Sequence, residues 1–130
     1  IKNVELIEEL KKYKLAGVKF LPIQFRPTFD KFKGEVCNGI FLQVIDRSKF
    51  LPLKTAIAII YTLKQLYHKK FEWYKGGYEY EQKLPAIDIL YGNSDLRTVV
   101  DTNGDIKKIF ADISITPKKL DYYKKWRIYK

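Results

Sequence analysis

The chain has 130 residues, 46% of them hydrophobic and 15% aromatic, which excludes a disordered polymer and predicts one globular domain spanning residues 1–130. A single cysteine excludes a disulfide framework, and the longest apolar run, residues 56–61, is too short for a membrane span. The formal net charge is +10, but 21 of the 25 basic residues are lysine. Because recognition of bases and phosphates favours arginine, we interpret the charge as a solvated lysine-rich surface rather than a nucleic-acid site.

The N-terminal segment carries apolar residues at helical spacing, with acidic residues toward its start and basic residues toward its end. We therefore expect a helix over residues 4–15, with Asn3 as its N-cap and Gly17 as its stop. Residues 18–25 then predict a strand, and Pro22 within it indicates an edge position or a bulge.

Proline, glycine and asparagine interrupt residues 26–38, which predicts an irregular loop. The β-branched and aromatic residues of 39–46 follow, and they predict a buried strand. We expect Asp46 to end this strand and to order the turn after it. Cys37, at the end of the loop, is expected to be a small packed thiol rather than a nucleophile.

Residues 53–69 give the clearest helical pattern, and Pro52 precedes them where proline is tolerated. Its apolar face consists of Leu53, Ile57, Ile60, Leu63 and Tyr67. We expect this helix to cover the sheet and to supply much of the core.

Residues 71–80 place four aromatic side chains around two adjacent glycines. They are Trp73, Tyr74, Tyr78 and Tyr80, beside Gly76 and Gly77. The pattern predicts a hairpin or a packed loop, and it leaves open a platform on which sugar rings could stack.

Capping residues and helical spacing predict several short helices after this stretch. They are residues 84–90, 95–101 after Ser94, 105–113, and 118–129 after Thr116 and Pro117. Together the elements predict an α+β fold, with a small, mainly antiparallel sheet packed against one long helix and several short C-terminal helices.

The sequence offers little catalytic chemistry. With one histidine, His68, and one cysteine there is no zinc-binding set and no nucleophile–base pair. Glycoside hydrolysis usually needs two carboxylates, and the candidates near the loop, Asp30, Glu35 and Asp46, do not form an evident acid–base pair. We therefore predict no catalytic residue, no metal site and no cofactor in this chain.

Several pieces of sequence occur in one order along the chain. The first are Phe25-x-Pro27-Thr28, then Lys33-Gly34-Glu35-x-Cys37-x-Gly39, and then a hydrophobic strand that ends in Asp46-Arg47. They are followed by Phe50 with Pro52 and a helix, by Phe71-x-Trp73, and by Leu90-x-Gly92 with Arg97 beyond. The last is a terminal aromatic segment that ends in Arg127-Ile128-Tyr129. In this order the chain resembles the C-terminal domain of the NamZ-type exo-β-N-acetylmuramidases. The resemblance extends over nearly the whole chain.

The resemblance implies a parent enzyme that removes N-acetylmuramic acid from the non-reducing end of peptidoglycan glycans, outside the cell or in the envelope of a bacterium. Catalysis would belong to an N-terminal Rossmann-like domain of the same polypeptide, so this chain would form one wall of the substrate cleft and be inactive alone. The chain has no methionine and begins at Ile1, which also indicates a fragment or a processed product.

Polar residues of the loop supply donors and acceptors suited to the hydroxyl, acetamido and carboxylate groups of a peptidoglycan-derived saccharide. The predicted substrate-binding residues are Arg26, Thr28, Lys33, Glu35 and Asn38. The alternative function is a free-standing basic module that binds nucleic acid or an anionic cell-wall polymer.

Overall fold

The computed structural model describes residues 1–114, 121 and 124–125. The elements in this part of the chain are α1 (Asn3–Leu10), the 3-10 turn η1 (Lys11–Tyr13), β1 (Val18–Phe25), β2 (Cys37–Val44), α2 (Pro52–Leu66), α3 (Ala86–Tyr91), α4 (Asp95–Asp101) and α5 (Ile106–Asp112). The predicted α+β class and the antiparallel sheet are confirmed. The expectation of one long helix is not, because the longest helix, α2, has 15 residues.

The sheet is a two-stranded hairpin that runs from Val18↔Val44 at its open end to Phe25↔Cys37 at its loop end. β1 has the predicted bounds, whereas β2 begins and ends two residues before the predicted 39–46. The expectation that this strand is buried is wrong, since Phe41 is 51% exposed. Helices cover only one face of the hairpin, and in the described part of the chain no third strand extends it.

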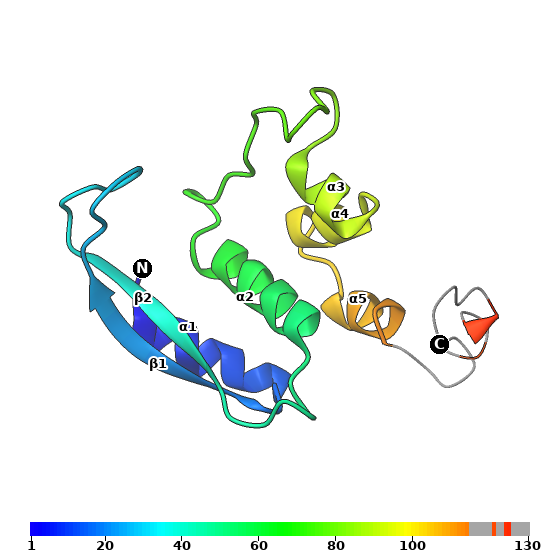
Figure 1. Ribbon diagram of the computed structural model, residues 1–130, viewed down its shortest axis with the longest axis horizontal. Coiled ribbons are helices and arrows are strands. Elements are labelled where there is room, and N and C mark those ends of the chain that lie inside the picture. Colours follow the sequence, from blue (N-terminus) through cyan, green and yellow to red (C-terminus); the bar gives the residue numbers. More distant parts are fainter. Residues whose placement is uncertain (115–120, 122–123, 126–130) are drawn as a thin grey trace.

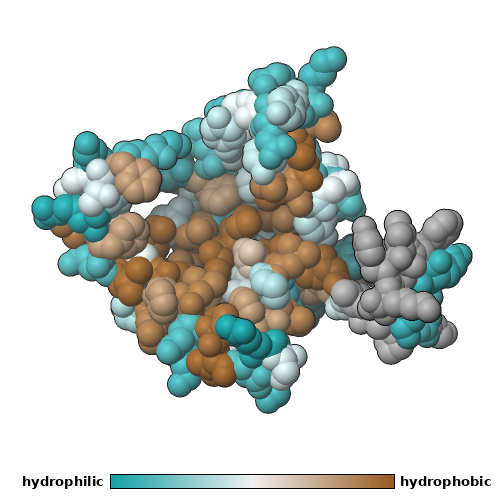
Figure 2. Space-filling model, in the orientation of Figure 1, coloured by the Kyte–Doolittle hydropathy of each residue, from teal (hydrophilic) through white to brown (hydrophobic). Residues whose placement is uncertain are grey.

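The uncovered face of the hairpin is apolar near the loop. Leu21 and Phe41 are direct cross-strand partners on this face, and both are more than 40% exposed. The Phe25 ring lies over Gly39, where a Cβ would come within 3.0 Å of it. Figure 2 shows apolar surface across the hairpin and the middle of the molecule.

The first helix is shorter than predicted. α1 ends at Leu10, η1 adds one 3-10 turn, and Lys14 ends the turn with a left-handed φ of 47°. Asn3 is not the N-cap but lies in the first helical turn, where its Nδ2 donates to the carbonyl of Ile23 at 3.2 Å. The side chain therefore ties α1 to the hairpin.

Gly17 closes the open end of the hairpin instead of ending the helix. Its carbonyl accepts the backbone N–H groups of Ile45 and Asp46, at 2.9 and 3.2 Å. Its φ is 76°, and a Cβ at this position would overlap the Asp46 carbonyl. Glycine is required here by both the backbone conformation and the available space.

Helix α2 lies between α1 with the hairpin on one side and α4 with α5 on the other (Figure 1), and it packs against a group of buried side chains on each side. On one side Ile57 packs with residues of α4 and α5, namely Leu96, Val100, Ile106 and Ile109. On the other side Ala58 packs with Leu6 and Leu10 of α1. Because both sides are covered, the buried residues of α2 do not form the single face that its spacing predicted.

Leu53, which the helical spacing predicted to face the core, is 50% exposed. Two threonines are buried instead. Thr55 Oγ1 donates to the carbonyl of Leu51 at 2.9 Å, and Thr62 Oγ1 donates to that of Ala58 at 2.7 Å. These bonds to the preceding turn satisfy the hydroxyls, so threonine can occupy an apolar contact.

The shorter helices follow the prediction closely. α4 has the predicted bounds, α5 is one residue shorter at each end than expected, and α3 begins at Ala86 rather than residue 84. Ser94 precedes α4 but makes no side-chain capping bond, whereas Asp105 caps α5 by accepting from the N–H of Lys107 at 2.9 Å. The helix expected at 118–129 lies outside the continuously described residues. Among those that are described, no helix is long and apolar enough to cross a membrane.

Candidate functional site

The loop between β1 and β2, residues 26–36, is folded back on itself rather than simply joining the strands. The N–H of Gly34 donates to the carbonyl of Pro27 at 2.9 Å, and the N–H of Glu35 donates to that of Phe32 at 2.9 Å. These bonds give the loop a defined backbone path. A shorter turn would be enough to join two antiparallel strands, since hairpin loops usually have about two to five residues.

Three residues of the loop adopt the left-handed region. Their φ angles are 59° at Asp30, 60° at Phe32 and 79° at Gly34. This conformation is uncommon for residues other than glycine, and it is most unfavourable for bulky side chains such as Phe32. Backbone strain of this kind is concentrated in binding and catalytic loops, which makes the loop the first candidate for the site.

The structure places four of the predicted binding residues on this loop and the fifth on β2. Arg26, Thr28, Lys33 and Glu35 are exposed, and their side chains make no hydrogen bond or ion pair with other described residues. Asn38 is also exposed, and its Oδ1 accepts from Gln24 Nε2 at 3.1 Å across the hairpin. The five residues thus share a surface region without being bonded to one another.

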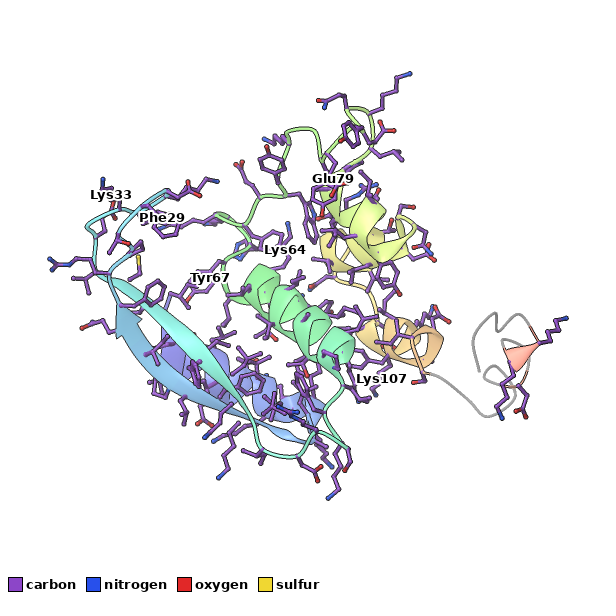
Figure 3. The ribbon with its side chains drawn as sticks, viewed as in Figure 1. Phe29, Lys33, Lys64, Tyr67, Glu79 and Lys107 are labelled. Carbon is purple, nitrogen blue, oxygen red and sulfur yellow. The ribbon has the colours of Figure 1, made fainter. Side chains whose placement is uncertain are left out.

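Sequence reasoning missed the aromatic residues of the loop. Phe29 is 77% exposed and Phe32 is 62% exposed, although phenylalanine normally packs in a core. Figure 3 shows Phe29 and Lys33 at the same end of the molecule as Tyr67, which follows α2. The signal in the sequence is phenylalanine placed between turn-forming residues.

A second candidate surface lies around Trp73. The indole Nε1 of Trp73 donates to Asp101 Oδ1 at 2.8 Å, and the Phe71 ring meets the indole edge-on with centroids 5.0 Å apart. Lys64 Nζ lies 5.2 Å from the Phe71 centroid and 3.7 Å from Asp101 Oδ1. These contacts fix the orientation of the indole and place the positive charge of Lys64 beside the Asp101 carboxylate.

An ion pair between α3 and α4 borders the same surface. Arg97 donates from Nε and Nη2 to the two carboxylate oxygens of Asp88, at 2.8 and 2.7 Å. The hydrogen bonds from Arg97 lower the pKa of Asp88 below its usual value, and those to Asp88 raise the pKa of Arg97. Such a two-bond pair holds the guanidinium plane in one orientation.

Between these groups lies a hollow of ≈ 300 Å³. Its lining includes Trp73, Tyr74, Lys75, Lys83, Arg97 and Asp101. The chain turns beside it through a single antiparallel bridge between Tyr78 and Glu81, which agrees with the predicted hairpin or packed loop. Tyr80 is fully exposed.

Acidic side chains and possible metal ligands form a further set of candidates. In residues 1–114, 121 and 124–125 there is no group of three or more His, Cys, Asp or Glu side chains able to hold a metal ion. Asp46 orders a turn, as predicted: it accepts from the N–H and Oγ of Ser48 at 3.0 and 2.6 Å and lies 3.0 Å from Lys49 Nζ. The Ser48 hydrogen bond, with the Lys49 contact, lowers the pKa of Asp46.

Comparison with known proteins identifies the domain type. The family described as "Exo-beta-N-acetylmuramidase NamZ, C-terminal" matches residues 1–128. The peptidoglycan beta-N-acetylmuramidase NamZ of Bacillus subtilis is 35% identical over 127 residues, which are 98% of this chain and 28% of that protein. A crystal structure of a DUF1343 family protein from Bacteroides fragilis has the same fold, with a TM-score of 0.73 and 17% identity over 100% of this chain and 33% of that one. The chain therefore belongs to the family of NamZ C-terminal domains.

Proposed function

We propose that this chain is the C-terminal domain of a bacterial exo-β-N-acetylmuramidase that releases N-acetylmuramic acid from the non-reducing end of peptidoglycan fragments. The observation that carries the proposal is the 35% identity to a peptidoglycan beta-N-acetylmuramidase over 98% of the chain. The match covers 28% of the relative, so the proposal includes an N-terminal Rossmann-like catalytic domain in the same polypeptide. With peptidoglycan as the proposed substrate, the proposal also includes a location outside the cell or in the cell envelope.

The exposed apolar side chains on the uncovered face of the hairpin support the proposal of a partner domain. Leu21, Phe25 and Phe41 are 43%, 48% and 51% exposed on one face of a rigid sheet. Contiguous exposed apolar surface of this kind is typical of contacts with other protein. The occupant that we propose is the remainder of the same polypeptide, because a relative more than three times as long carries this domain at its C-terminal end.

The loop of residues 26–36 is the part that we propose for the wall of the substrate cleft. It continues directly from the apolar end of the hairpin, so a domain docked there would lie beside it. The side chains of Thr28 and Lys33 on this loop are exposed and make no hydrogen bond or ion pair with other described residues. A hydroxyl and an ammonium suit the hydroxyl and lactyl carboxylate groups of N-acetylmuramic acid.

The test is steady-state kinetics of the full-length protein on a chromogenic N-acetylmuramic acid glycoside. Thr28→Ala and Lys33→Ala should each raise KM or lower kcat about 10-fold, the effect of one lost hydrogen bond to the substrate, with an unchanged melting temperature. Lys107→Ala is the matched control, because Lys107 is an exposed lysine on α5, away from the loop (Figure 3). Wild-type kinetics in both loop variants, or loss of activity only through unfolding, would show that the loop is scaffold.

The alternative function, a basic module for nucleic acid or an anionic wall polymer, is separated from this one by binding measurements. Non-specific DNA binding usually has a Kd of about 10⁻⁴–10⁻⁶ M at physiological salt. Salt-sensitive binding of a short duplex clearly tighter than that range, without hydrolysis of the glycoside by the full-length protein, would favour the alternative.

A further inference from the structure

We propose that the hollow beside Trp73 is a binding subsite for a single sugar residue that carries a carboxylate. The hollow is separate from the loop of residues 26–36 and uses different side chains. The choice of N-acetylmuramic acid as that sugar rests on the proposed function, whereas the ligand class follows from the lining of the hollow.

The aromatic lining is held in place. Trp73 is fixed by its bond to Asp101 and by the edge of Phe71, as described above. Tyr74 is 62% exposed, and its phenol lies directly against the backbone of Gly76, where a Cβ would overlap it. A ring that is both exposed and positioned offers a face on which the C–H face of a pyranose can stack at little conformational cost.

The neighbouring glycine has the same effect on a polar side chain. A Cβ at Gly77 would overlap the side-chain amide of Gln82, which also lines the hollow. The two glycines therefore allow an aromatic ring and an amide to lie close against the turn. An amide provides both a donor and an acceptor, as recognition of hydroxyl and acetamido groups requires.

The charges around the hollow favour an anion. Lys75, Lys83 and Arg97 line it, against the single carboxylate of Asp101, which Trp73 and Lys64 already engage. Within the described residues no carboxylate lies within ion-pair distance of the Lys83 ammonium. An anionic group in the hollow would therefore meet one cation, the Lys83 ammonium, that has no carboxylate partner among the described residues.

Each of the other two cations can also contribute. Lys75 lies 3.5 Å from Glu72, but both side chains are more than 70% exposed, so water screens this pair. Arg97 uses two of its five N–H groups on Asp88, and this pairing leaves the others available in a fixed plane. A planar carboxylate matches such a donor.

The size of the hollow limits the ligand. At ≈ 300 Å³ it is at the lower end of the about 300–1,000 Å³ found for small-molecule sites, which suits one ring rather than a chain. Aromatic rings with cations could also accept a nucleotide. We favour the sugar because Tyr74 is open at the surface and Gln82 offers an amide, and because the family acts on glycans by its description.

The test is a titration of this chain, followed by the indole N–H resonance of Trp73, with N-acetylmuramic acid, N-acetylglucosamine and adenosine monophosphate. The two sugars share a ring and an acetamido group but differ in the lactyl carboxylate. N-acetylmuramic acid should bind about 3- to 10-fold more tightly, the contribution of one partly exposed charge-assisted contact. Lys83→Ala should reduce that preference, and Tyr74→Ala should weaken the binding of both sugars equally.

Lys107→Ala, on α5, is the control and should leave the affinity for both sugars unchanged. Both Lys83 and Tyr74 are exposed, so neither replacement should change the melting temperature. Equal affinity for the two sugars, or no response to Lys83→Ala, would overturn the proposal. Tighter binding of adenosine monophosphate than of either sugar would assign the hollow to nucleotides instead.

Hydrolysis of the chromogenic glycoside by the full-length protein separates this inference from the proposed function. Hydrolysis without sugar binding at the hollow refutes the subsite and leaves the function. Selective binding of N-acetylmuramic acid without hydrolysis refutes the function and leaves the subsite.

Discussion

Replacement of Ile57 by alanine tests the central position of α2. Ile57 is 1% exposed and packs with side chains of α4 and α5. Loss of its three terminal carbon atoms costs about 2–3 kcal/mol in transfer free energy, and the remaining cavity raises this to about 3–4 kcal/mol. Leu53, one turn earlier, is 50% exposed, so Leu53→Ala should cost only about 1 kcal/mol or less.

The assay is urea unfolding of this chain, followed by far-ultraviolet circular dichroism and by tryptophan fluorescence. The two variants should share the slope m of the wild type and differ in midpoint, because neither replacement changes the overall surface exposed on unfolding. The free energies of unfolding should differ by at least about 2 kcal/mol. If the two replacements cost the same, α2 does not lie between the two groups of buried side chains, and the burial described for it is wrong.

Three further predictions follow from individual contacts. Gly17→Ala should destabilise the chain more than Gly92→Ala in the same urea assay, because both glycines have positive φ but only a Cβ at Gly17 would overlap backbone atoms; equal losses would mean that the turn at Gly17 can relax. The folded-state pKa of Asp88 lies below the ordinary value of 3.8, so this group contributes stability above that pH and loses it as the pH falls through the folded-state pKa. Asp88→Asn should therefore lower stability at neutral pH and flatten the stability–pH curve below about pH 4, and an unchanged curve would contradict the ion pair. Finally, this chain alone should not hydrolyse a chromogenic N-acetylmuramic acid glycoside, and turnover by the purified chain would show that it contains its own acid–base pair.

Local sequence patterns correctly predicted the elements whose ends are set by residues adjacent in the sequence. β1 has eight residues and lies between a glycine turn and a proline-containing loop, and its bounds were predicted correctly. α4 is bounded by Ser94 and by the turn at residues 102–104, and its bounds were also predicted correctly. In both cases the turn-forming residues lie immediately beside the element, so no tertiary contact was needed to place its ends.

The end of the first helix could not be predicted in this way. Gly17 is the residue that normally ends a helix, but Lys14 adopts the left-handed conformation instead, with a φ of 47°. Gly17 is instead used at the open end of the hairpin, where its carbonyl accepts two N–H groups from the segment after β2. These hydrogen bonds offset the cost of the left-handed conformation at Lys14. A requirement set by residues 45 and 46 is not visible in the sequence around residue 14.

The candidate site was predicted as a segment but not as a surface. The glycine, proline and aspartate of the loop indicated irregular backbone, and the structure confirms a folded loop there. The exposure of Phe29 depends on the path set by left-handed residues such as Asp30, which residue types alone do not fix. The hollow beside Trp73 joins residues 73–85 to α4, and such long-range contacts cannot be derived from local spacing.

The error about the second strand has a physical meaning. A strand with apolar residues on both faces is typical of burial on both faces, and that pattern led to the prediction for residues 39–46. Along the uncovered face of the hairpin, the pair at the open end, Lys19↔Gln43, is polar, whereas Leu21↔Phe41 and the pairs nearer the loop are apolar. Contiguous exposed apolar side chains are typical of surfaces that contact other protein. The change from polar to apolar toward the loop therefore supports a contact with the rest of the polypeptide at the loop end of the hairpin, which is where the proposed cleft wall lies.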